Sequence, residues 1–234
     1  MALTCYNTNT VSFINKEGVE LLRIGKDKTG SHTYDSVYIK DNDSAAVSSS
    51  AGNNRCIVII DTESQKVMTI ISMDTYINDK AVRGISIFYF AWNKGLQMLN
   101  LSDKSVSDII KSEMSGVYYV ATSGDKLYYT NLNTHTVTCC ELHGTTQWEF
   151  KNIRVLPCPV GISVDNDGNV YVARFISNNV VILFPCELRQ RKLLSSSDDL
   201  KNPRVVDYDK STNRLLVVNN SSAAFLFDVS KGRL

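Results

Sequence analysis

The sequence has few of the residues and motifs on which catalysis and metal binding usually depend. It contains three histidines and six cysteines, and no two cysteines have the CxxC spacing of a zinc site or a redox pair. The motifs G-x-S-x-G, H-E-x-x-H and the P-loop do not occur in it either. We therefore expect no cofactor, no bound metal and no small-molecule substrate, and we expect a protein that is not an enzyme. The cysteines are expected to be reduced and mostly buried as small apolar side chains.

Long hydrophobic runs are missing as well. The longest, Cys56–Ile60 and Val180–Phe184, are far shorter than the ~18 apolar residues that a membrane-spanning helix needs. The N-terminal stretch MALTCYNTNT has neither the basic region nor the apolar region of a signal peptide. These absences predict a cytoplasmic location and no membrane partner.

No charge of one sign dominates the composition. The net charge is +1, hydrophobic residues make up 43% of the chain and charged residues 21%. Such a composition is typical of a globular protein, and it lacks the basic excess of a dedicated nucleic-acid-binding domain. A local basic patch is compatible with this balance, so RNA stays open as a partner.

What the sequence does contain is a repeat of about 43 residues. The segment 159–184, PVGISVDNDGNVYVARFISNNVVILF, aligns with the segment 203–227, PRVVDYDKSTNRLLVVNNSSAAFLF. Similar phrases occur earlier in the chain, at 126–140, 95–107 and 58–69. Each unit holds three or four short runs of β-branched and aromatic residues, separated by Gly, Asn, Asp, Ser or Thr. These runs are predicted strands joined by hairpin turns, because no segment has a convincing helical period.

A period of about 40–45 residues with about four strands per unit predicts a β-propeller. We therefore expect one all-β domain, residues 1–234, with about six blades of up to four antiparallel strands. A five-bladed ring with an irregular closure is the alternative. In the third unit, GISIFYF (84–90) is assigned as the first strand and AW as a short second strand. The predicted blade-like units are approximately 1–26, 33–73, 82–112, 114–152, 159–196 and 203–230.

The first and last blades are predicted to be incomplete. The first unit contains runs that match the second, third and fourth strands of a blade, and the last unit contains runs that match the first three. A chain that starts in mid-blade is expected to be one piece of a longer protein.

The motif P-x-G-I-x-V-D-x-x-G-N-V-Y-V-A, followed by S-N-x-V, occupies Pro159–Val180. This motif resembles the NHL repeat of β-propellers. Together with YYTNLNTHTVTCCELHGTTQWEF (128–150) and DYDKSTNRLLVVN (207–219), it makes the block 116–229 similar to the C-terminal propellers of tripartite-motif (TRIM-NHL-like) proteins, as abundant in molluscs.

In that family the propeller follows the RING, B-box and coiled-coil segments of E3 ubiquitin ligases. The six scattered cysteines of this sequence cannot supply the eight zinc ligands of a RING, so any ligase activity would need segments that the sequence lacks. The resemblance therefore implies a protein-recognition module of a ubiquitin-pathway protein. Its partner would be another protein or a ubiquitination substrate.

The stretch DNDGN (165–169) raises the question of a calcium loop. An EF-hand loop has a glycine at its sixth position and a bidentate Glu at its twelfth. If Gly168 is the sixth residue, the twelfth is Arg174, which cannot bind calcium. A hairpin turn needs only a residue that adopts positive φ, which Gly168 supplies. The stretch is therefore predicted to be a turn between two strands and not a metal site.

Binding residues are expected in the loops of one face. In a propeller, the connections from fourth to first strand and from second to third strand lie on the same face, and loops on a rigid scaffold commonly carry function. Arg83 and Arg204 align just before the first strands of their units, and the turns between second and third strands add polar and aromatic residues. The predicted partner-binding residues are Arg83, Trp92, Lys94, His135, Arg174, Phe175, Arg204 and Asn219.

Arginine and aromatic side chains are frequent in protein hot spots, and they also bind RNA bases and phosphates. Protein recognition is the predicted function, and RNA binding in post-transcriptional regulation is the alternative. A metal-dependent propeller hydrolase or lactonase is a second alternative. It would need carboxylates that converge from several first strands, and the predicted first strands contain few.

Overall fold

The computed structural model describes residues 2–5, 10–14, 19–25, 33–51, 54–111, 119–185, 189–220 and 223–229. Within these ranges the elements are β-strands and two short 3-10 turns, η1 (Lys40–Asn42) and η3 (Ser196–Asp198). None of the helical segments in these ranges has the length and hydropathy needed to cross a membrane. The strands belong to two compact units, residues 1–115 and 116–234, which are described separately.

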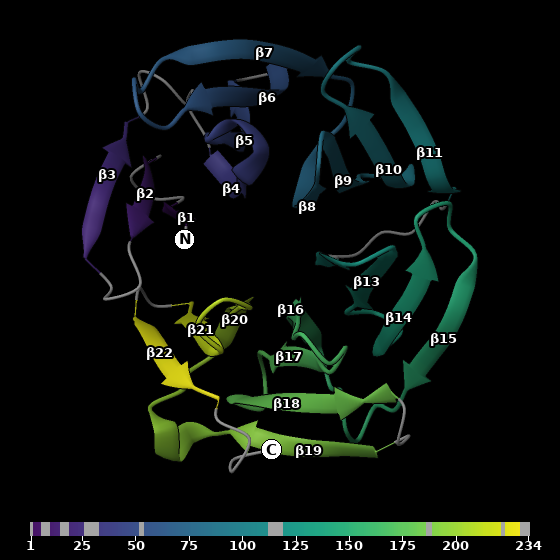
Figure 1. The fold of residues 1–234 in the computed structure, drawn as a ribbon. Helices are drawn as coiled ribbons and strands as arrows, with labels where there is room; N and C mark the ends of the chain where they lie inside the picture. Colours follow the sequence, from purple (N-terminus) through teal and green to yellow (C-terminus); the bar gives the residue numbers. More distant parts are fainter. Residues whose placement is uncertain are drawn as a thin grey trace. The chain divides into compact units, whose positions relative to one another are not determined.

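The first unit contains three antiparallel sheets, in which the strands lie side by side in chain order (Figure 1). They are β1 (Ala2–Cys5), β2 (Thr10–Ile14) and β3 (Glu20–Ile24); β4 (Thr33–Ile39), β5 (Ser44–Ala51), β6 (Asn54–Asp61) and β7 (Val67–Met73); and β8 (Ile77–Arg83), β9 (Ser86–Ala91), β10 (Gly95–Asn100) and β11 (Val106–Lys111). The first strands of successive sheets lie next to each other, since β4 contacts β8.

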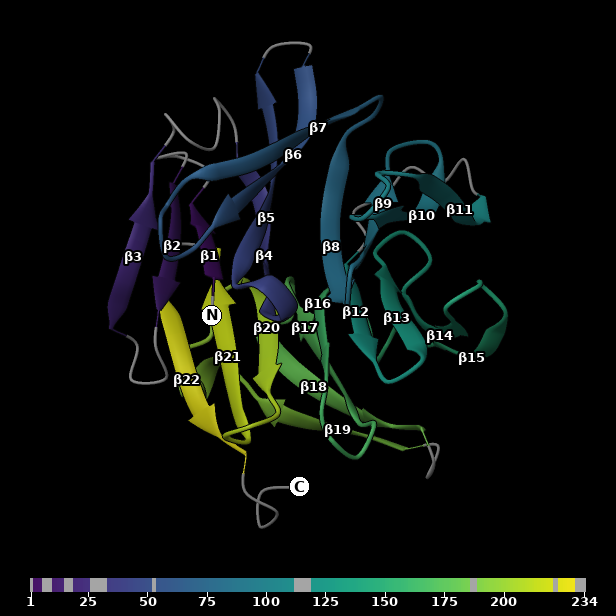
Figure 2. The same cartoon turned by 45° about the horizontal axis from the view of Figure 1, so that its top comes forward.

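The second unit also contains three antiparallel sheets. They are β12 (Val120–Ser123), β13 (Lys126–Asn131), β14 (Thr136–Glu141) and β15 (Thr146–Lys151); β16 (Pro159–Val164), β17 (Val170–Arg174), β18 (Asn179–Phe184) and β19 (Arg189–Leu194); and β20 (Pro203–Asp209), β21 (Arg214–Asn219) and β22 (Ala224–Asp228). β16 contacts both β12 and β20. Figure 2 shows the three strands of the last sheet side by side.

The chain is an all-β propeller built mostly of four-stranded antiparallel blades, so the fold class predicted from the repeat is confirmed. The described strands form four sheets of four strands and two sheets of three, and the three-stranded sheets are the first and the last. That one domain spans the whole chain stays a prediction.

Bulges in the strand pairing identify the strands of the two short sheets. In all four complete sheets the pairing of the second with the third strand has a continuous register, whereas the pairing of the third with the fourth is interrupted, for example between Cys139 and Cys140. The pair β1–β2 is continuous and β2–β3 is interrupted between Phe13 and Ile14. β1 to β3 therefore match the second, third and fourth strands of a blade, as the sequence predicts.

The last sheet has the opposite pattern. Its first pair, β20–β21, is interrupted between Pro203 and Val205, and its second pair, β21–β22, is continuous. The first pair of the neighbouring sheet, β16–β17, is also interrupted, between Pro159 and Ile162. β20 to β22 therefore match the first three strands of a blade, which is also the predicted assignment.

The strand assignment of the third predicted unit was wrong. The first strand of that sheet is β8, with the sequence INDKAVR, and the stretch assigned as the first strand contains the second strand, β9. Trp92 lies in the turn after β9 and not in a strand. The sequence does not predict β8 as a strand because β8 carries Asn, Asp and Lys at positions 78–80. Its burial also depends on a residue from another strand.

That partner is Asp35 of β4. The ammonium group of Lys80 is fully buried and donates a 2.7 Å hydrogen bond to the Asp35 carboxylate, whose side chain is 24% exposed. Lys80 also donates to the hydroxyl of Ser48, at 3.2 Å. A buried charge needs a paired and hydrogen-bonded partner. The ion pair therefore explains how a charged strand lies in the interior of the first unit.

The middle strands of the second unit are buried on both faces. In β17, Val170 and Val172 pack toward Tyr128 and Val137 of the preceding sheet. Tyr171 and Ala173, the alternating residues, pack with the apolar side chains of β20 and β21. Because both faces meet apolar neighbours, these strands are near-continuous hydrophobic runs instead of alternating ones.

The stretch DNDGN is a hairpin turn between β16 and β17, so the predicted turn is confirmed. Asp165 is buried, and its Oδ1 accepts hydrogen bonds from the backbone N–H groups of Asp167 and Asn169, at 2.9 and 2.8 Å. Its Oδ2 accepts from the Asn169 amide at 2.9 Å and from the Tyr171 hydroxyl at 3.2 Å. Gly168 adopts a φ of 83°. Both carboxylate oxygens thus bind donors of the hairpin itself.

Cys139 and Cys140 are free and fully buried, as expected from the sequence. Burial raises the pKa of the Cys140 thiol to about 12 and also raises the pKa of the Cys139 thiol. Cys56 and Cys158 are free and partly buried. The side chains of Cys5 and Cys186 lie outside the described part of the chain.

Replacing Asp35 by Asn is expected to destabilise the protein strongly. The change leaves the buried Lys80 ammonium without a carboxylate, and breaking a buried ion pair costs about 3 kcal/mol or more. Asp228→Asn is the matched control, because Asp228 is 77% exposed and pairs with Arg214 at the surface, where an ion pair contributes less than ~1 kcal/mol. Urea unfolding measures both. Equal free energies of unfolding for the two variants would contradict the structural role of the pair.

Replacing Gly161 by Ala tests the close approach of β16 to β20. An added Cβ would lie 2.5 Å from the carbonyl oxygen of Arg204 and 2.9 Å from Val205 Cα, so the strands must move apart. We expect a loss of about 2 kcal/mol in the free energy of unfolding, as for other overpacked sites. The control Gly124→Asn should lose less, because no atom lies within 4 Å of the new Cβ and Asn tolerates the φ of +60° found there. A larger loss at Gly124 would contradict the prediction.

Candidate functional site

The loops at one end of β9 in the first unit form the candidate site. The turn that follows β9 is hydrogen-bonded to the segment that precedes β8: the Trp92 N–H donates to the Tyr76 carbonyl at 2.9 Å. The Thr75 hydroxyl donates to the Trp92 carbonyl, also at 2.9 Å. The turn between second and third strands and the connection to the first strand therefore lie on the same face of this unit. We call residues 74–76 and 92–94 the Trp92 face.

The Trp92 face presents two large aromatic side chains to solvent. Trp92 is 43% exposed and Tyr76 is 41% exposed. Lys94 lies beside them and forms an exposed ion pair with Asp74. Among the described residues the hydrogen bonds of Trp92 involve its backbone atoms, and the residue keeps 43% of its surface exposed.

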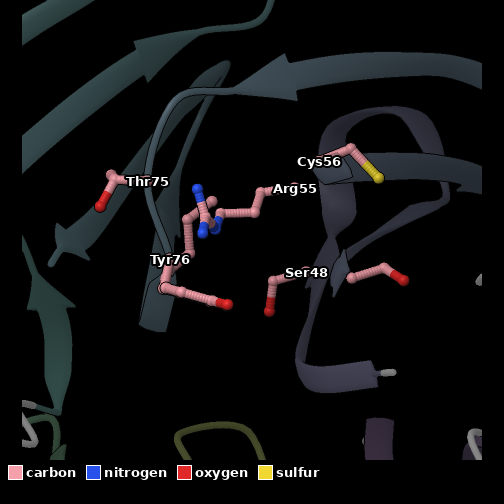
Figure 3. A pocket seen from close by; sticks show the side chains of 7 residues that line it. Ser48, Arg55, Cys56, Thr75 and Tyr76 are labelled. Carbon is pink, nitrogen blue, oxygen red and sulfur yellow. The ribbon is translucent and has the colours of Figure 1, made fainter. Parts of the chain in front are cut away.

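A small pocket lies next to this face (Figure 3). Its volume is about 10 Å³, which is room for about one water molecule. The residues that line it come from the end of β5, the start of β6 and the segment before β8, which meet at this end of the unit. They are Ser48, Ser49, Arg55, Cys56, Thr75, Tyr76 and Ile77.

Arg55 is the cation of this pocket. Its guanidinium carbon lies 3.9 Å from the centre of the Tyr76 ring, and Figure 3 shows its side chain reaching toward Tyr76. The Arg55 Nε and the Ser49 hydroxyl are both buried and have no hydrogen-bond partner among the described residues. Arg55 lies on the face of the sheet that carries Ala46 and Ile57, whereas Ser49 lies on the opposite face with Cys56, so the two unpaired groups do not face each other.

Ser48 connects the pocket to the buried ion pair. Its hydroxyl accepts from Lys80 at 3.2 Å and lies 3.3 Å from the Asp35 carbonyl oxygen, to which it donates. The Lys80 charge is balanced by the Asp35 carboxylate. The local positive charge at the pocket therefore comes from Arg55.

In the second unit, two of the predicted binding residues hold loops together. The Nδ1 atom of His135 accepts a 3.2 Å hydrogen bond from the Cys158 N–H. The Asn219 side chain, which is buried, accepts from the Lys201 N–H and donates to the Asp199 carbonyl, both at 3.1 Å. These polar atoms thus join the turns between second and third strands to the segments that enter first strands.

Arg174 and Phe175 also make internal contacts. The Arg174 guanidinium donates to the Asn179 side chain and to the Val155 carbonyl, and burial lowers the pKa of this guanidinium. Phe175 packs against the hydrophobic core that contains Tyr171 and Leu215. Both residues therefore position the hairpin that carries them.

Arg204 is exposed, and its Nε donates to the Tyr119 hydroxyl at 2.8 Å. Arg83 is also exposed, but the predicted equivalence of the two arginines is wrong. Arg83 is the last residue of the first strand β8, whereas Arg204 is the second residue of the first strand β20. They lie at opposite ends of the first strands of their sheets. The error follows from the missed strand β8.

Sequence reasoning missed Ser49, Arg55 and Tyr76. Ser49 lies in β5 and Arg55 in β6, and Tyr76 lies in the segment between β7 and β8, which falls between the predicted units 33–73 and 82–112. One signal was available, because Arg55 directly precedes the apolar run CIVII (56–60). A charged residue at the entrance to a buried strand needs a partner or an outlet to solvent.

No protein-family model matches the chain, and no curated protein matches it. Solved structures match it over nearly its whole length at low sequence identity. A protein of unknown function from Bacteroides thetaiotaomicron aligns with a TM-score of 0.73 and 14% identity over 96% of this chain. The chain spans 65% of the length of that structure.

Two further structures have printed functions. A chain in the crystal structure of a nidogen/laminin complex aligns with a TM-score of 0.71 and 12% identity, over 99% of this chain and 94% of that one. A virginiamycin B lyase from Staphylococcus aureus aligns with a TM-score of 0.66 and 13% identity, over 98% of this chain and 80% of that one. At such identities the similarity shows the β-propeller fold alone, and the resemblance to tripartite-motif proteins stays a prediction.

Proposed function

We propose that this chain is a non-enzymatic recognition module that binds a protein partner through the Trp92 face. The observation that carries the proposal is the exposure of Trp92 and Tyr76, at 43% and 41%, on segments tied to each other by backbone hydrogen bonds. Aromatic side chains next to arginine are enriched in the residues that dominate protein–protein binding energy. A rigid support lowers the entropy lost on binding.

The resemblance in the block 116–229 supports a place for this module in a TRIM-like ubiquitin-pathway protein, in the cytoplasm, with a ubiquitination substrate as the partner. The nidogen/laminin complex supports the proposal in a general way, because a similar fold occurs there in an assembly of two proteins.

The contacts of Lys80 support the non-enzymatic part of the proposal. Ser48 is a hydroxyl within 3.2 Å of a lysine, which is the arrangement of a serine nucleophile with a lysine base. However, Lys80 donates to the Asp35 carboxylate at 2.7 Å, and both Lys80 and Ser48 are buried. A general base has to accept the proton of the nucleophile, and Lys80 is engaged as a donor to both of its partners.

Replacing Trp92 by Ala is expected to remove most of the partner binding without unfolding the protein. Truncation of a central aromatic hot spot costs about 2 kcal/mol or more, which is over tenfold in affinity. The measurement is quantitative affinity capture from cytosol, with the wild type and the variant as baits at equal concentration. Circular dichroism of both baits checks that the fold is kept.

Ile85→Ala is the matched control. Ile85 is 50% exposed and lies in the turn before β9, at the end of that strand opposite to Trp92. Proteins that wild type and Ile85→Ala retain, and that Trp92→Ala loses, support the proposal if they persist after ribonuclease treatment. Equal capture by the two variants would place recognition elsewhere, and loss on ribonuclease treatment would favour the RNA-binding alternative.

A further inference from the structure

We propose that β7 of the first unit pairs with β7 of a second copy of this chain. The two strands run antiparallel about a two-fold axis at Ile70, so that two four-stranded sheets join edge to edge. Such a dimer goes beyond the proposed function, because it is formed by the outer edge of a sheet and not by the Trp92 face. Three features of β7 support it: an open edge, exposed apolar side chains without charge, and ends of opposite charge.

The outer edge of β7 is open. β7 is the last strand of the sheet β4 to β7, and Figure 1 shows it as the outermost strand of that sheet. One of its edges pairs with β6, and in the described part of the chain no strand pairs with the other. An edge strand presents a row of backbone N–H and C=O groups that a further strand can bind.

The side chains of β7 are unusually exposed and apolar. Val67, Met68 and Ile70 are 38%, 54% and 59% exposed, and no other strand in the described ranges has more than one exposed large hydrophobic residue. Met68 and Ile70 share one face of the strand, because alternate residues point the same way. Ile71 and Met73, on the opposite face, pack in the core of the unit. β7 therefore keeps apolar surface in water beside its open edge.

The lack of charge distinguishes β7 from the other strands at the fourth position of a blade. Its sequence is VMTIISM, whereas β3, β11, β15 and β19 each contain at least two charged residues. Charged side chains on an edge strand oppose its pairing with another chain. β7 lacks this protection, so its edge is suited to receive a strand.

The residues at the two ends of β7 select a second copy as the partner. Lys66 directly precedes the strand and Asp74 directly follows it, and both are exposed. In an antiparallel pair centred on Ile70, Lys66 of each copy lies opposite Asp74 of the other. The Asp74 side chain is 70% exposed beside Lys94, so it has room for a second cation. A parallel pair would instead bring like charges together.

The same register also matches the apolar side chains. Ile70 lies opposite Ile70 of the second copy, and Met68 lies opposite Ser72, all on the exposed face of the strand. Side chains directly opposite each other in an antiparallel pair have Cβ atoms about 4.5–5.5 Å apart and interact. Pairing therefore covers Met68 and Ile70, and a two-fold axis makes one strand complementary to its own copy.

Sedimentation equilibrium of the full chain over a series of concentrations tests the dimer. We expect the mass of two chains at high concentration and of one chain on dilution, because a single strand pair is a small interface. Ile70→Lys places two like charges opposite each other and is expected to raise the dissociation constant at least about tenfold. Val106→Lys is the matched control, since Val106 is 47% exposed in the outer strand β11, and it is expected to leave the dissociation constant unchanged.

Exchanging the charges at the ends of β7 tests the pairing without changing its apolar side chains. Lys66→Asp and Asp74→Lys, made singly, each put like charges opposite each other and are expected to weaken the dimer about threefold. The double variant restores opposite charges and is expected to recover most of the affinity. Circular dichroism checks that each variant keeps the fold.

Disulfide formation locates the two-fold axis. In the proposed register the two Cα atoms of residue 70 lie about 5 Å apart, a distance that a disulfide spans, so copper phenanthroline in air is expected to link two chains of Ile70→Cys. Met68→Cys is the control. Its position lies opposite residue 72 of the second copy, which leaves the two residues 68 about 13 Å apart along the strands, too far for a disulfide.

Three results would overturn the proposal: a wild type that stays monomeric at every concentration, equal weakening by Ile70→Lys and Val106→Lys, or linking of Met68→Cys in preference to Ile70→Cys. A monomeric wild type would leave the open edge to a strand from a different protein. Trp92→Ala is expected to keep the dimer intact, so a failure of this inference and a failure of the proposed function are distinguishable.

Discussion

The rest of the structure depends on one constraint, the face-to-face packing of successive sheets, which leaves the middle strands of a blade without a solvent-exposed face. In β17 the odd and even side chains enter two different cores, one shared with the preceding sheet and one with the following sheet. Every residue of such a strand must therefore be apolar, small or individually compensated. The first strands β16 and β8 obey the same rule. Gly161 of β16 is the small case, because β20 approaches it too closely for a Cβ atom. Lys80 is the compensated case, because Asp35 accompanies it into the interior of its unit.

The same constraint decides what the loops do. Since the strand bodies are buried, the turns and connections must satisfy their polar groups among themselves. His135 and Asn219 use their side chains for this purpose, and Arg174 does the same at the next hairpin. In the turn after β9 the backbone of Trp92 makes these contacts instead. The polar residues of these loops thus mostly hold the loops together, whereas Trp92 and Tyr76 are large aromatic residues that stay partly exposed.

The repeat was readable from the sequence because hairpin turns and strands have local signals. Gly168 supplies a positive φ, Asp165 caps the turn, and the runs on each side are β-branched. The unit 159–196 was therefore predicted with nearly the bounds of the sheet β16 to β19, Pro159–Leu194. β8 was missed because its strand character depends on Asp35, which lies about 45 residues away in the chain. Because β8 was missed, the second strand β9 was assigned as the first strand of its blade. Arg83 was therefore wrongly aligned with Arg204.

The candidate site, like the fold, could be predicted from the sequence only in part. The sequence by itself determined the fold class, the turn positions and the choice of loops, because each depends on neighbouring residues and on a repeated pattern. Tertiary structure alone decided which loop residues make internal hydrogen bonds and which large side chains are exposed. It also decided that Ser49, Arg55 and Tyr76 line one pocket, because they come from three different segments of the first unit. Their proximity follows from sheets packed against each other, and no local pattern encodes that contact.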